Sequence, residues 1–189
     1  MEIIPQAIAP ALLLKPPRFT DPRGFFTELY SSRALAAEGI TFKFVQDNLS
    51  FSAAPGTVRG LHFQTSPSEQ TKLVCVLTGA ILDVAVDLRT GSPSYGRHVA
   101  VELTEENGLQ LLVPRGFAHG FCTLAPNTRV LYKVDGFYDR ERDLGLRWND
   151  PALGIAWPVV EADAKLSDKD RVQPLLSELP HYFTYGGEA

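Results

Sequence analysis

The sequence predicts an all-β protein built as a sandwich or a barrel. From Phe42 to Val134, short stretches rich in Val, Ile, Leu, Phe and Thr alternate with turns that contain Pro, Gly or Asn. These turns recur at roughly 8–12 residues, a spacing typical of antiparallel sandwiches and barrels. Only two short segments have the pattern of a helix, so the sequence favours sheets over helical layers.

Length and composition set the broad class of protein. The chain of 189 residues suits one domain with a sizeable core, and we expect a single domain from residue 1 to residue 189. Its composition, 44% hydrophobic and 21% charged, is that of an ordinary soluble protein. The net charge of -4 argues against non-specific nucleic-acid binding. Without an apolar run of roughly 18 residues or a signal-peptide pattern, we expect a cytoplasmic protein with neither nucleic acid nor membrane as partner.

The first 30 residues have the pattern of edge strands. Residues 3 to 14 are mostly apolar, but Pro5 and Pro10 interrupt them, which suits edge strands better than a helix. A turn signal at Asp21 and Gly24 then precedes an aromatic segment, where we expect a further strand.

Two short helices are predicted, one near each end of the chain. The first covers residues 33–38, with Ser31 or Ser32 as its cap and Gly39 at its end. The second begins after Ser167, where acidic residues occupy the first turn and interact favourably with the helix dipole.

The two cysteines, Cys75 and Cys122, each lie within an apolar strand-like run. Their surroundings predict buried, reduced thiols of a cytosolic protein. The spacing offers partners for neither a disulfide nor a metal site.

Two consecutive strands carry polar side chains where an ordinary core would be apolar. Alternation puts His62 and Gln64 on one face of the first strand, and Gln70 and Lys72 share a face of the second. If the strands pair with these faces together, an imidazole, an ammonium and two amides line one concave surface. A bulge at the preceding Gly60 would turn its neighbour, an arginine, toward the same pocket.

A second signature lies between Gly108 and His119, where Pro114 and Gly116 form a tight turn between two strands. This spacing resembles that of the cupins, which are small jelly-roll barrels, and it would deliver the histidine to the barrel interior. We therefore expect a cupin-type jelly-roll barrel with a short N-terminal helix and a short C-terminal helical region.

Metal-binding cupins pair this signature with a second group of ligands on an earlier strand. Here Gln64 stands in the place of one histidine, which reduces the set to His62, Glu69 and His119. Glutamine is a poor ligand for a transition metal, so the sequence disfavours a metal site.

Nine motifs, which include the stretches already described, follow one another along nearly the whole chain and resemble one family. They are Phe19-x-Asp21-x-Arg23-Gly24-x-Phe26-x-Glu28, Gln46-Asp47-Asn48-x-Ser50, Arg59-Gly60-Leu61-His62-Phe63-Gln64, Gln70-x-Lys72-Leu73-Val74, Asp83-Val84-x-Val86-Asp87-Leu88-Arg89, Pro114-x-Gly116-Phe117-Ala118-His119-Gly120-Phe121, Tyr132-Lys133, Trp148-Asn149-Asp150-Pro151 and Leu166-Ser167-x-Lys169-Asp170. The chain resembles the dTDP-4-dehydrorhamnose 3,5-epimerases, a metal-free lineage of cupins.

The resemblance implies an isomerase without a cofactor that acts on dTDP-4-dehydro-6-deoxy-D-glucose and yields dTDP-4-dehydro-L-rhamnose for dTDP-L-rhamnose biosynthesis. Both reacting carbons, C3 and C5, flank the C4 ketone, so the enzyme needs a base, a group that stabilises the enolate oxygen, and an acid on the opposite ring face. His62 matches the base and Asp170 the carboxylate that orients it. Lys72 matches the enolate-stabilising cation, and Tyr132 matches the acid.

The resemblance also implies which residues hold the nucleotide. Arg23 and Arg59 match phosphate contacts, since a guanidinium pairs with two oxygens at once, and Lys169 is a further contact. Phe26 and Tyr138 are expected to stack on thymine.

Further residues are expected to contact the nucleoside or the sugar, with His119 at the sugar. The nucleoside and sugar hydroxyls would be held by Glu28, Gln46, Asp47, Asn48 and Asp143. In the family the last of these positions is often a glutamate. The resemblance further implies a homodimer whose N-terminal strands join the partner's sheet.

Three alternatives stay open at this point. A sister enzyme would invert only C3 or only C5 of a related dTDP-keto sugar with the same residues. A non-catalytic nucleotide-sugar binder and a metal-dependent cupin oxygenase belong to other classes. The presence of base, acid and enolate-stabilising lysine together argues against the binder.

Overall fold

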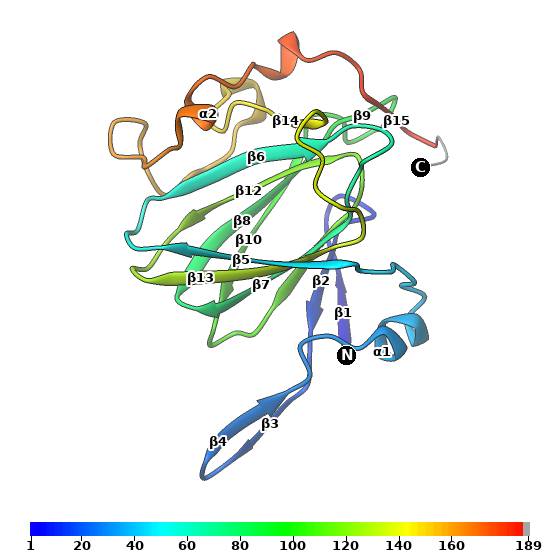
Figure 1. Ribbon diagram of the computed structural model, residues 1–189, viewed down its shortest axis with the longest axis vertical. Coiled ribbons are helices and arrows are strands. Elements are labelled where there is room, and N and C mark those ends of the chain that lie inside the picture. The colour runs from blue at the N-terminus through cyan, green and yellow to red at the C-terminus, as the bar shows by residue number, and fades with distance from the viewer. Residues whose placement is uncertain (187–189) are drawn as a thin grey trace.

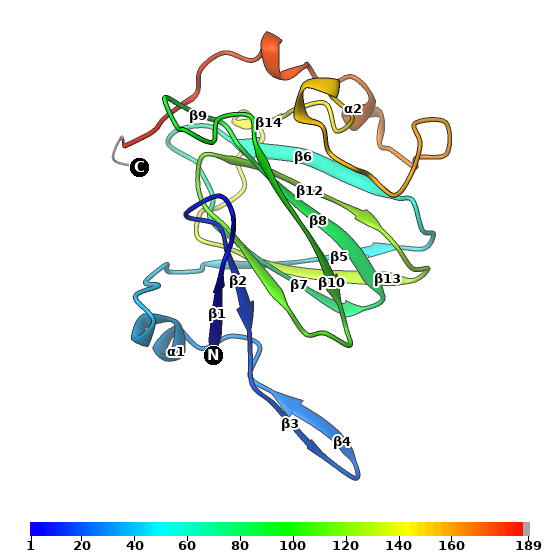
Figure 2. The ribbon, with the colours of Figure 1, turned by 180° about the vertical axis from the view of Figure 1, so that it is seen from behind.

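The computed structural model describes residues 1–186, and two antiparallel β-sheets stacked face to face form most of it (Figures 1 and 2). The six-stranded sheet contains, in order across it, β1 (Glu2–Pro5), β2 (Leu12–Lys15), β11 (Gln110–Val113), β7 (Lys72–Thr78), β13 (Thr128–Val134) and β5 (Gln46–Ser52). The five-stranded sheet contains β10 (His98–Thr104), β8 (Ala80–Asp87), β12 (Phe117–Thr123), β6 (Val58–Gln64) and β14 (Asp143–Gly145). The prediction of an all-β protein is confirmed.

Smaller elements surround the two sheets. They are the hairpin β3 (Arg18–Asp21) and β4 (Gly24–Thr27), the parallel pair β9 (Arg89–Thr90) and β15 (Phe183–Thr184), the helices α1 (Ser32–Ala37) and α2 (Asp168–Arg171), and the 3-10 turns η1 (Pro151–Leu153) and η2 (Leu176–Glu178). The serine caps lie where the sequence predicts them, because Ser31 accepts from the third residue of its helix and Ser167 does the same at α2. No helix among residues 1–186 is long and apolar enough to cross a membrane.

The apolar core fills the space between the two sheets. On β7, Val74 and Val76 point inward, and they pack with Ile81 and Phe121 of the opposite sheet. Alternation along each strand leaves the other face to solvent or to the covering loops. Cys75 and Cys122 are buried and unpaired, as predicted.

The pairing considered for the two polar strands is wrong. β6 and β7 lie in different sheets, so His62 and Lys72 face each other's sheet instead of sharing one. The loop between the strands, residues 65–71, crosses from one sheet to the other. The polar surface is therefore the lining of a space between the sheets.

A bulge at Gly60 gives β6 two polar residues on one side. Opposite β12, His62 pairs with His119 and Arg59 pairs with Phe121, so two residues of β6 face the single Gly120. Gly60 has a positive φ of 119°, and an added Cβ would lie 2.6 Å from the Gly120 Cα. Only glycine fits here, and the bulge lets Arg59 and His62 line the same cavity, as the sequence predicted.

The N-terminal strands β1 and β2 belong to the chain's own six-stranded sheet, where β2 pairs with β11. The hairpin β3–β4, in contrast, projects away from both sheets and pairs only with itself (Figures 1 and 2). Its aromatic residues Phe19, Phe25 and Phe26 are exposed.

Candidate active site

Two adjoining hollows lie between the sheets, and both are lined by His62, Lys72 and Tyr132. The larger, of about 450 Å³, is closed by the segment before α2 and contains Arg59, His119 and Asp170 in its lining. The smaller, of about 390 Å³, extends toward β14 and the start of β5. Because His62 comes from the five-stranded sheet and the lysine and tyrosine from the six-stranded sheet, the three groups converge from opposite walls.

His62 is paired with a buried carboxylate. Its Nε2 lies 2.5 Å from Oδ1 of Asp170, the third residue of α2. Ser167, the cap of that helix, donates to the other carboxylate oxygen at 2.8 Å. Within the described residues Nδ1 of His62 has no hydrogen-bond partner, so it is the ring atom that can accept a proton.

Asp170 is held in its charged form. Burial alone would raise its pKa, but hydrogen bonds from His62, Ser167 and the Gly60 backbone N–H, together with the charge of His62, outweigh burial and lower the pKa. An ionised carboxylate accepts from Nε2–H and leaves Nδ1 basic.

Lys72, the first residue of β7, has no ion-pair partner among residues 1–186 and lines both hollows. Burial lowers its pKa to about 8, while the charges of Asp143 and Asp83 raise it and that of Lys169 lowers it. An unpaired ammonium in such a place is suited to stabilise an anion of a bound ligand.

Tyr132 lies on β13, opposite Asn48 of β5 and Val74 of β7. Burial raises its pKa above the ordinary value, with the charge of Arg59 acting in the other direction. The phenol therefore keeps its proton at neutral pH and can serve as a donor from the wall opposite His62.

A second histidine–carboxylate pair lies beside the first. His119 on β12 is paired across the strands with His62, and its Nε2 lies 2.7 Å from Oδ1 of Asp83 on β8. Asp83 is fully buried, and within residues 1–186 its Oδ2 has no partner. The sequence analysis named Asp83 within a motif but gave it no role, although an acidic residue inside the apolar run of residues 81–86 is a signal that could have found one.

The sequence analysis also gave no role to Ser50 and Ser52, which lie on the inner face of β5. Ser52 accepts a hydrogen bond from Nε of Arg59 at 3.2 Å, while a terminal nitrogen of the guanidinium donates to the Phe51 carbonyl. Ser50 lines the larger hollow, and its hydroxyl is buried without a partner among the described residues. Ser52 holds Arg59 in place, and Ser50 leaves a hydroxyl free for a ligand.

Comparison with known proteins identifies the family of this chain. The family model described as dTDP-4-dehydrorhamnose 3,5-epimerase matches residues 5–178. A protein of that name from Sinorhizobium fredii is 51% identical over 179 residues, which are 95% of this chain and 91% of that protein. The chain belongs to the dTDP-4-dehydrorhamnose 3,5-epimerase family. It is an isomerase.

Solved structures of related epimerases lead to the same result. The Bacillus anthracis dTDP-4-dehydrorhamnose 3,5-epimerase, with TDP and PPi bound, has 53% identity and a TM-score of 0.89, covering 92% of this chain and 98% of that one. The Legionella pneumophila dTDP-6-deoxy-D-glucose-3,5-epimerase, in complex with dTDP-4-keto-L-rhamnose, has 40% identity and a TM-score of 0.93, with 98% and 99% covered. ChmJ, a 3'-monoepimerase from Streptomyces bikiniensis, has 32% identity and a TM-score of 0.85, with 92% and 87% covered.

In this epimerase, β5 brings only part of its predicted motif to the cavity. Gln46 and Asn48 line the smaller hollow and are hydrogen-bonded to each other at 2.8 Å. Asp47 lies between them on the opposite face, where its carboxylate pairs with Lys133. Because side chains alternate along a strand, the Asp47 side chain is not available to a ligand in the cavity, and its predicted contact is not supported by this chain.

At the mouth of the smaller hollow, three predicted residues form one chain of contacts. Tyr138 and Asp143 line the hollow, and the tyrosine hydroxyl donates to the carboxylate at 3.1 Å. Lys169 of the epimerase does not line the hollow itself, but its ammonium lies 2.5 Å from the same carboxylate. The lysine thus links α2 to β14 beside the cavity.

Three predicted residues of the epimerase lie far from its cavity. Arg23 and Phe26 are on the projecting hairpin, with 90% of the arginine side chain and 67% of the phenylalanine exposed. The arginine forms an ion pair with Asp21 at the hairpin tip. Glu28 follows the hairpin and is exposed. None of them lines either hollow around His62.

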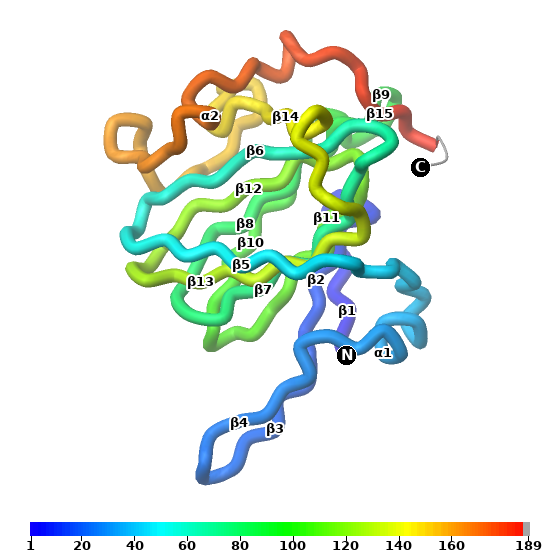
Figure 3. The backbone as a smooth tube through the Cα atoms, in the orientation of Figure 1, coloured from blue at the N-terminus to red at the C-terminus, as the bar shows by residue number. Residues whose placement is uncertain are grey.

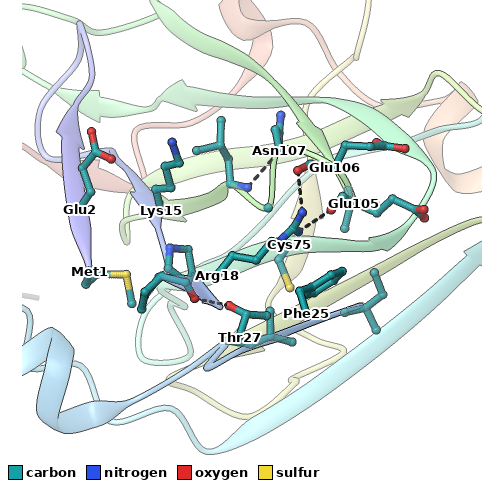
Figure 4. A pocket seen from close by; sticks show the side chains of 17 residues that line it. Met1, Glu2, Lys15, Arg18, Phe25, Thr27, Cys75, Glu105, Glu106 and Asn107 are labelled. Carbon is teal, nitrogen blue, oxygen red and sulfur yellow. Dashed lines mark hydrogen bonds between the residues drawn. The ribbon is translucent and has the colours of Figure 1, made fainter. Parts of the chain in front are cut away.

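A different cavity of the epimerase, of about 830 Å³, is larger than either hollow around His62 (Figure 4). It lies at the root of the hairpin, where the Arg18 guanidinium donates to the carbonyls of Glu105 and Glu106 and packs on Phe25. None of the predicted catalytic or substrate-binding residues lines it.

The residues considered as a metal set are not assembled in the described part of the epimerase. His62 and His119 share the larger hollow, but each is paired with its own aspartate, and Glu69 lines neither hollow. Among residues 1–186, no group of three or more His, Cys, Asp or Glu side chains is arranged to hold a metal ion.

Proposed function

We propose that this chain inverts C3 and C5 of dTDP-4-dehydro-6-deoxy-D-glucose and yields dTDP-4-dehydro-L-rhamnose. One observation carries the proposal: His62 and Tyr132 line the same cavity from opposite sheets, with Lys72 in its lining. Inversion next to a ketone needs a base and an acid on opposite faces of the sugar ring, and a cation for the enolate oxygen.

The first step is removal of a proton from a carbon next to the C4 ketone. Nδ1 of His62 takes the proton, while Asp170 holds Nε2 and stabilises the imidazolium that forms. The electron pair of the broken C–H bond moves into the ring and places negative charge on the ketone oxygen. The ammonium of Lys72 stabilises that charge, which is worth most where water is excluded.

The second step returns a proton to the same carbon from the opposite face. The Tyr132 phenol donates it, the enolate returns to the ketone, and the configuration is inverted. The raised pKa of Tyr132 supports this role, since the group stays protonated at neutral pH. The His62 imidazolium then loses its proton to water and the Tyr132 phenolate regains one from water, and the same two steps at the other carbon complete the double inversion.

The remaining cavity residues are assigned to the rest of the substrate. Arg59, fixed by β5, binds the diphosphate, and His119, oriented by Asp83, binds the sugar. Tyr138 stacks on thymine, and Asp143 binds a nucleoside hydroxyl.

Two further polar groups and one lysine complete the set. Gln46 and Asn48 line the smaller hollow and are assigned to nucleoside or sugar hydroxyls. Lys169 is assigned a contact at the mouth, where it already neutralises Asp143.

A homodimer would explain the residues that lie outside the cavity. The projecting hairpin has no partner in its own sheets among the described residues, and its three phenylalanines are exposed. We propose that it enters the partner subunit, where Arg23 binds phosphate, Phe26 packs on thymine and Glu28 contacts the nucleoside. The exchanged element is then the hairpin, since β1 and β2 pair within their own chain.

We also propose that the two sheets form one cupin-type jelly-roll domain in a cytoplasmic protein. The two facing sheets of six and five antiparallel strands suit a single cupin-type jelly-roll domain. Two free, buried cysteines suit a protein of the reducing cytoplasm.

Inversion of only one carbon is the second candidate, because the 3'-monoepimerase ChmJ is also similar to this chain. Incubation with dTDP-4-keto-6-deoxyglucose in heavy water separates the two functions. Deuterium at both C3 and C5 supports double inversion, and deuterium at one carbon supports single inversion.

Two variants test the roles of base and acid in the same assay. His62→Ala should abolish exchange at both carbons, whereas Tyr132→Phe should reduce product formation more than proton removal. A Tyr132→Phe enzyme that forms product at the parent rate would end the assignment of Tyr132 as the acid. No turnover in the parent, with dTDP-sugar binding unchanged in His62→Ala, would instead support a binding protein.

A further inference from the structure

Gln64, two residues after His62 on β6, bonds its whole side-chain amide to the backbone of two loops, one after β6 and one after β13. Its Nε2 donates to the carbonyls of Ser68 and Phe137 at 2.7 and 3.2 Å, and its Oε1 accepts from the backbone N–H of Asp139 at 2.7 Å. Only 5% of the residue is exposed, so these bonds are made away from bulk water. Phe137 and Asp139 are the two neighbours of Tyr138.

β6 also holds the other end of the chain that runs from β13 to β14. The backbone of Gln64 is paired with Asp143 of β14, and the N–H of Thr65 donates to the Arg142 carbonyl at 3.1 Å. Figure 3 shows the chain leaving β13 in the lower sheet and crossing to β14 beside β6. Residues 135–142, which link β13 to β14, are called the crossing segment. The end of β6 therefore holds the crossing segment at residues 137, 139 and 142, and it also pairs with Asp143 of β14.

Tyr138 itself has few contacts that could fix its position. The residue is 59% exposed, and its ring packs against no other aromatic ring among residues 1–186. Its hydroxyl makes one hydrogen bond, to Asp143 of β14. The direction of the ring depends on the backbone on either side of it, which Gln64 holds.

We propose that Gln64 is a positioning residue for the nucleotide end of the substrate. By fixing the backbone before and after Tyr138, it presents the tyrosine ring to a pyrimidine base at the mouth of the smaller hollow. The inference rests on the proposed function, because it takes the base of dTDP as the ring on which Tyr138 stacks. It also accounts for an amide at this place: the segment around Tyr138 offers one carbonyl and one N–H, the loop after β6 offers a second carbonyl, and glutamine matches all three.

The test is a double-mutant cycle between Gln64 and Tyr138, with dTDP affinity measured by calorimetry. Gln64→Met keeps the length of the side chain and removes all three hydrogen bonds, and it should weaken dTDP binding about tenfold. The kcat at saturating substrate should fall less than about threefold, because His62 and its aspartate are untouched. Ser68→Ala is the matched control: it removes only the bond between the serine hydroxyl and the Asp139 carboxylate, at 3.0 Å.

The cycle separates positioning from a general loss of structure. If Gln64 acts through the tyrosine ring, Gln64→Met in a Tyr138→Ala background should cost less than about twofold more in dTDP affinity. An equal loss with and without the tyrosine ring overturns the proposal, and so does an unchanged affinity in the single variant. Should Gln64→Met fail to fold, Gln64→Glu takes its place in the cycle, since it keeps the acceptor for Asp139 N–H and loses both donors.

Failure of this inference is distinct from failure of the proposed function. If Tyr138→Ala binds dTDP as the parent does, the stacking contact is wrong and the inference falls with it. The deuterium exchange that depends on His62 would still stand, because that assay reports proton removal and not the position of the base.

Discussion

A rise in pH should inactivate this epimerase well below the pH at which an ordinary lysine loses its charge. Burial lowers the pKa of Lys72 from the ordinary lysine value to about 8. A group of pKa about 8 is roughly nine-tenths charged at pH 7 and one-tenth charged at pH 9, so kcat/KM should fall about tenfold over this interval. An unperturbed lysine would keep more than about nine-tenths of its charge throughout.

Other groups with perturbed pKa values do not explain a loss of activity near pH 8. Burial raises the pKa of Tyr132 above the ordinary value, so the proposed acid keeps its proton over this range. Burial also raises the pKa of both thiols, Cys75 and Cys122, to about 11. Loss of activity near pH 8 would therefore report the ammonium of Lys72.

The assay is deuterium exchange into dTDP-4-keto-6-deoxyglucose, measured as kcat/KM over a range of pH. Lys72→Arg should remove the decline near pH 8, since a guanidinium stays charged. Asp83→Asn should move the midpoint to lower pH, because the Asp83 charge raises the Lys72 pKa. Asp163→Asn, an exposed residue, is the control. A midpoint unchanged in both Lys72→Arg and Asp83→Asn would refute the reasoning.

Three further predictions concern single residues. Asp170→Asn should lower kcat on the order of 10³-fold, because an amide no longer stabilises the imidazolium of His62; a loss below about tenfold, measured by steady-state kinetics, would contradict the pairing. Gly60→Ala should lower the free energy of unfolding by about 2–4 kcal/mol in denaturant titrations, since its Cβ would meet the Gly120 backbone at 2.6 Å. The control Gly154→Ala should lower it by only about 1 kcal/mol, because that position has a positive φ but no atom within 4 Å. Arg23→Ala should raise KM about tenfold, and mixed dimers of Arg23→Ala and His62→Ala chains should recover about half of the parent kcat/KM; no recovery would show that the hairpin acts within its own chain.

The strand pattern could be predicted from local features, whereas the proposed catalytic roles came only from the resemblance to a known family. Turns and alternation along a strand depend only on neighbouring residues, so the all-β fold and the inward faces of β5, β6 and β7 follow from the sequence. The same alternation could have shown that Asp47 points away from Gln46 and Asn48. The resemblance grouped the three together, and the ion pair of Asp47 with Lys133 corrects that grouping.

What the residues do beyond their own strand depended on the tertiary structure. Asp83 becomes a partner of His119 only because β8 and β12 are neighbours, although 36 residues separate the two in sequence. Gln64 lines the smaller hollow, but its amide is bonded to the Ser68 carbonyl in the loop after β6 and to the Phe137 carbonyl and Asp139 N–H of the segment after β13.

The sequence by itself determined which residue types are present and which strand face carries them, because side-chain direction follows from the local backbone. Only the tertiary structure decided that β6 lies in one sheet and β7 and β13 in the other, and this separation places His62 and Tyr132 on opposite walls of one cavity. The physical reason is that strand partners are chosen by burial of whole faces over long sequence distances, which no local pattern records.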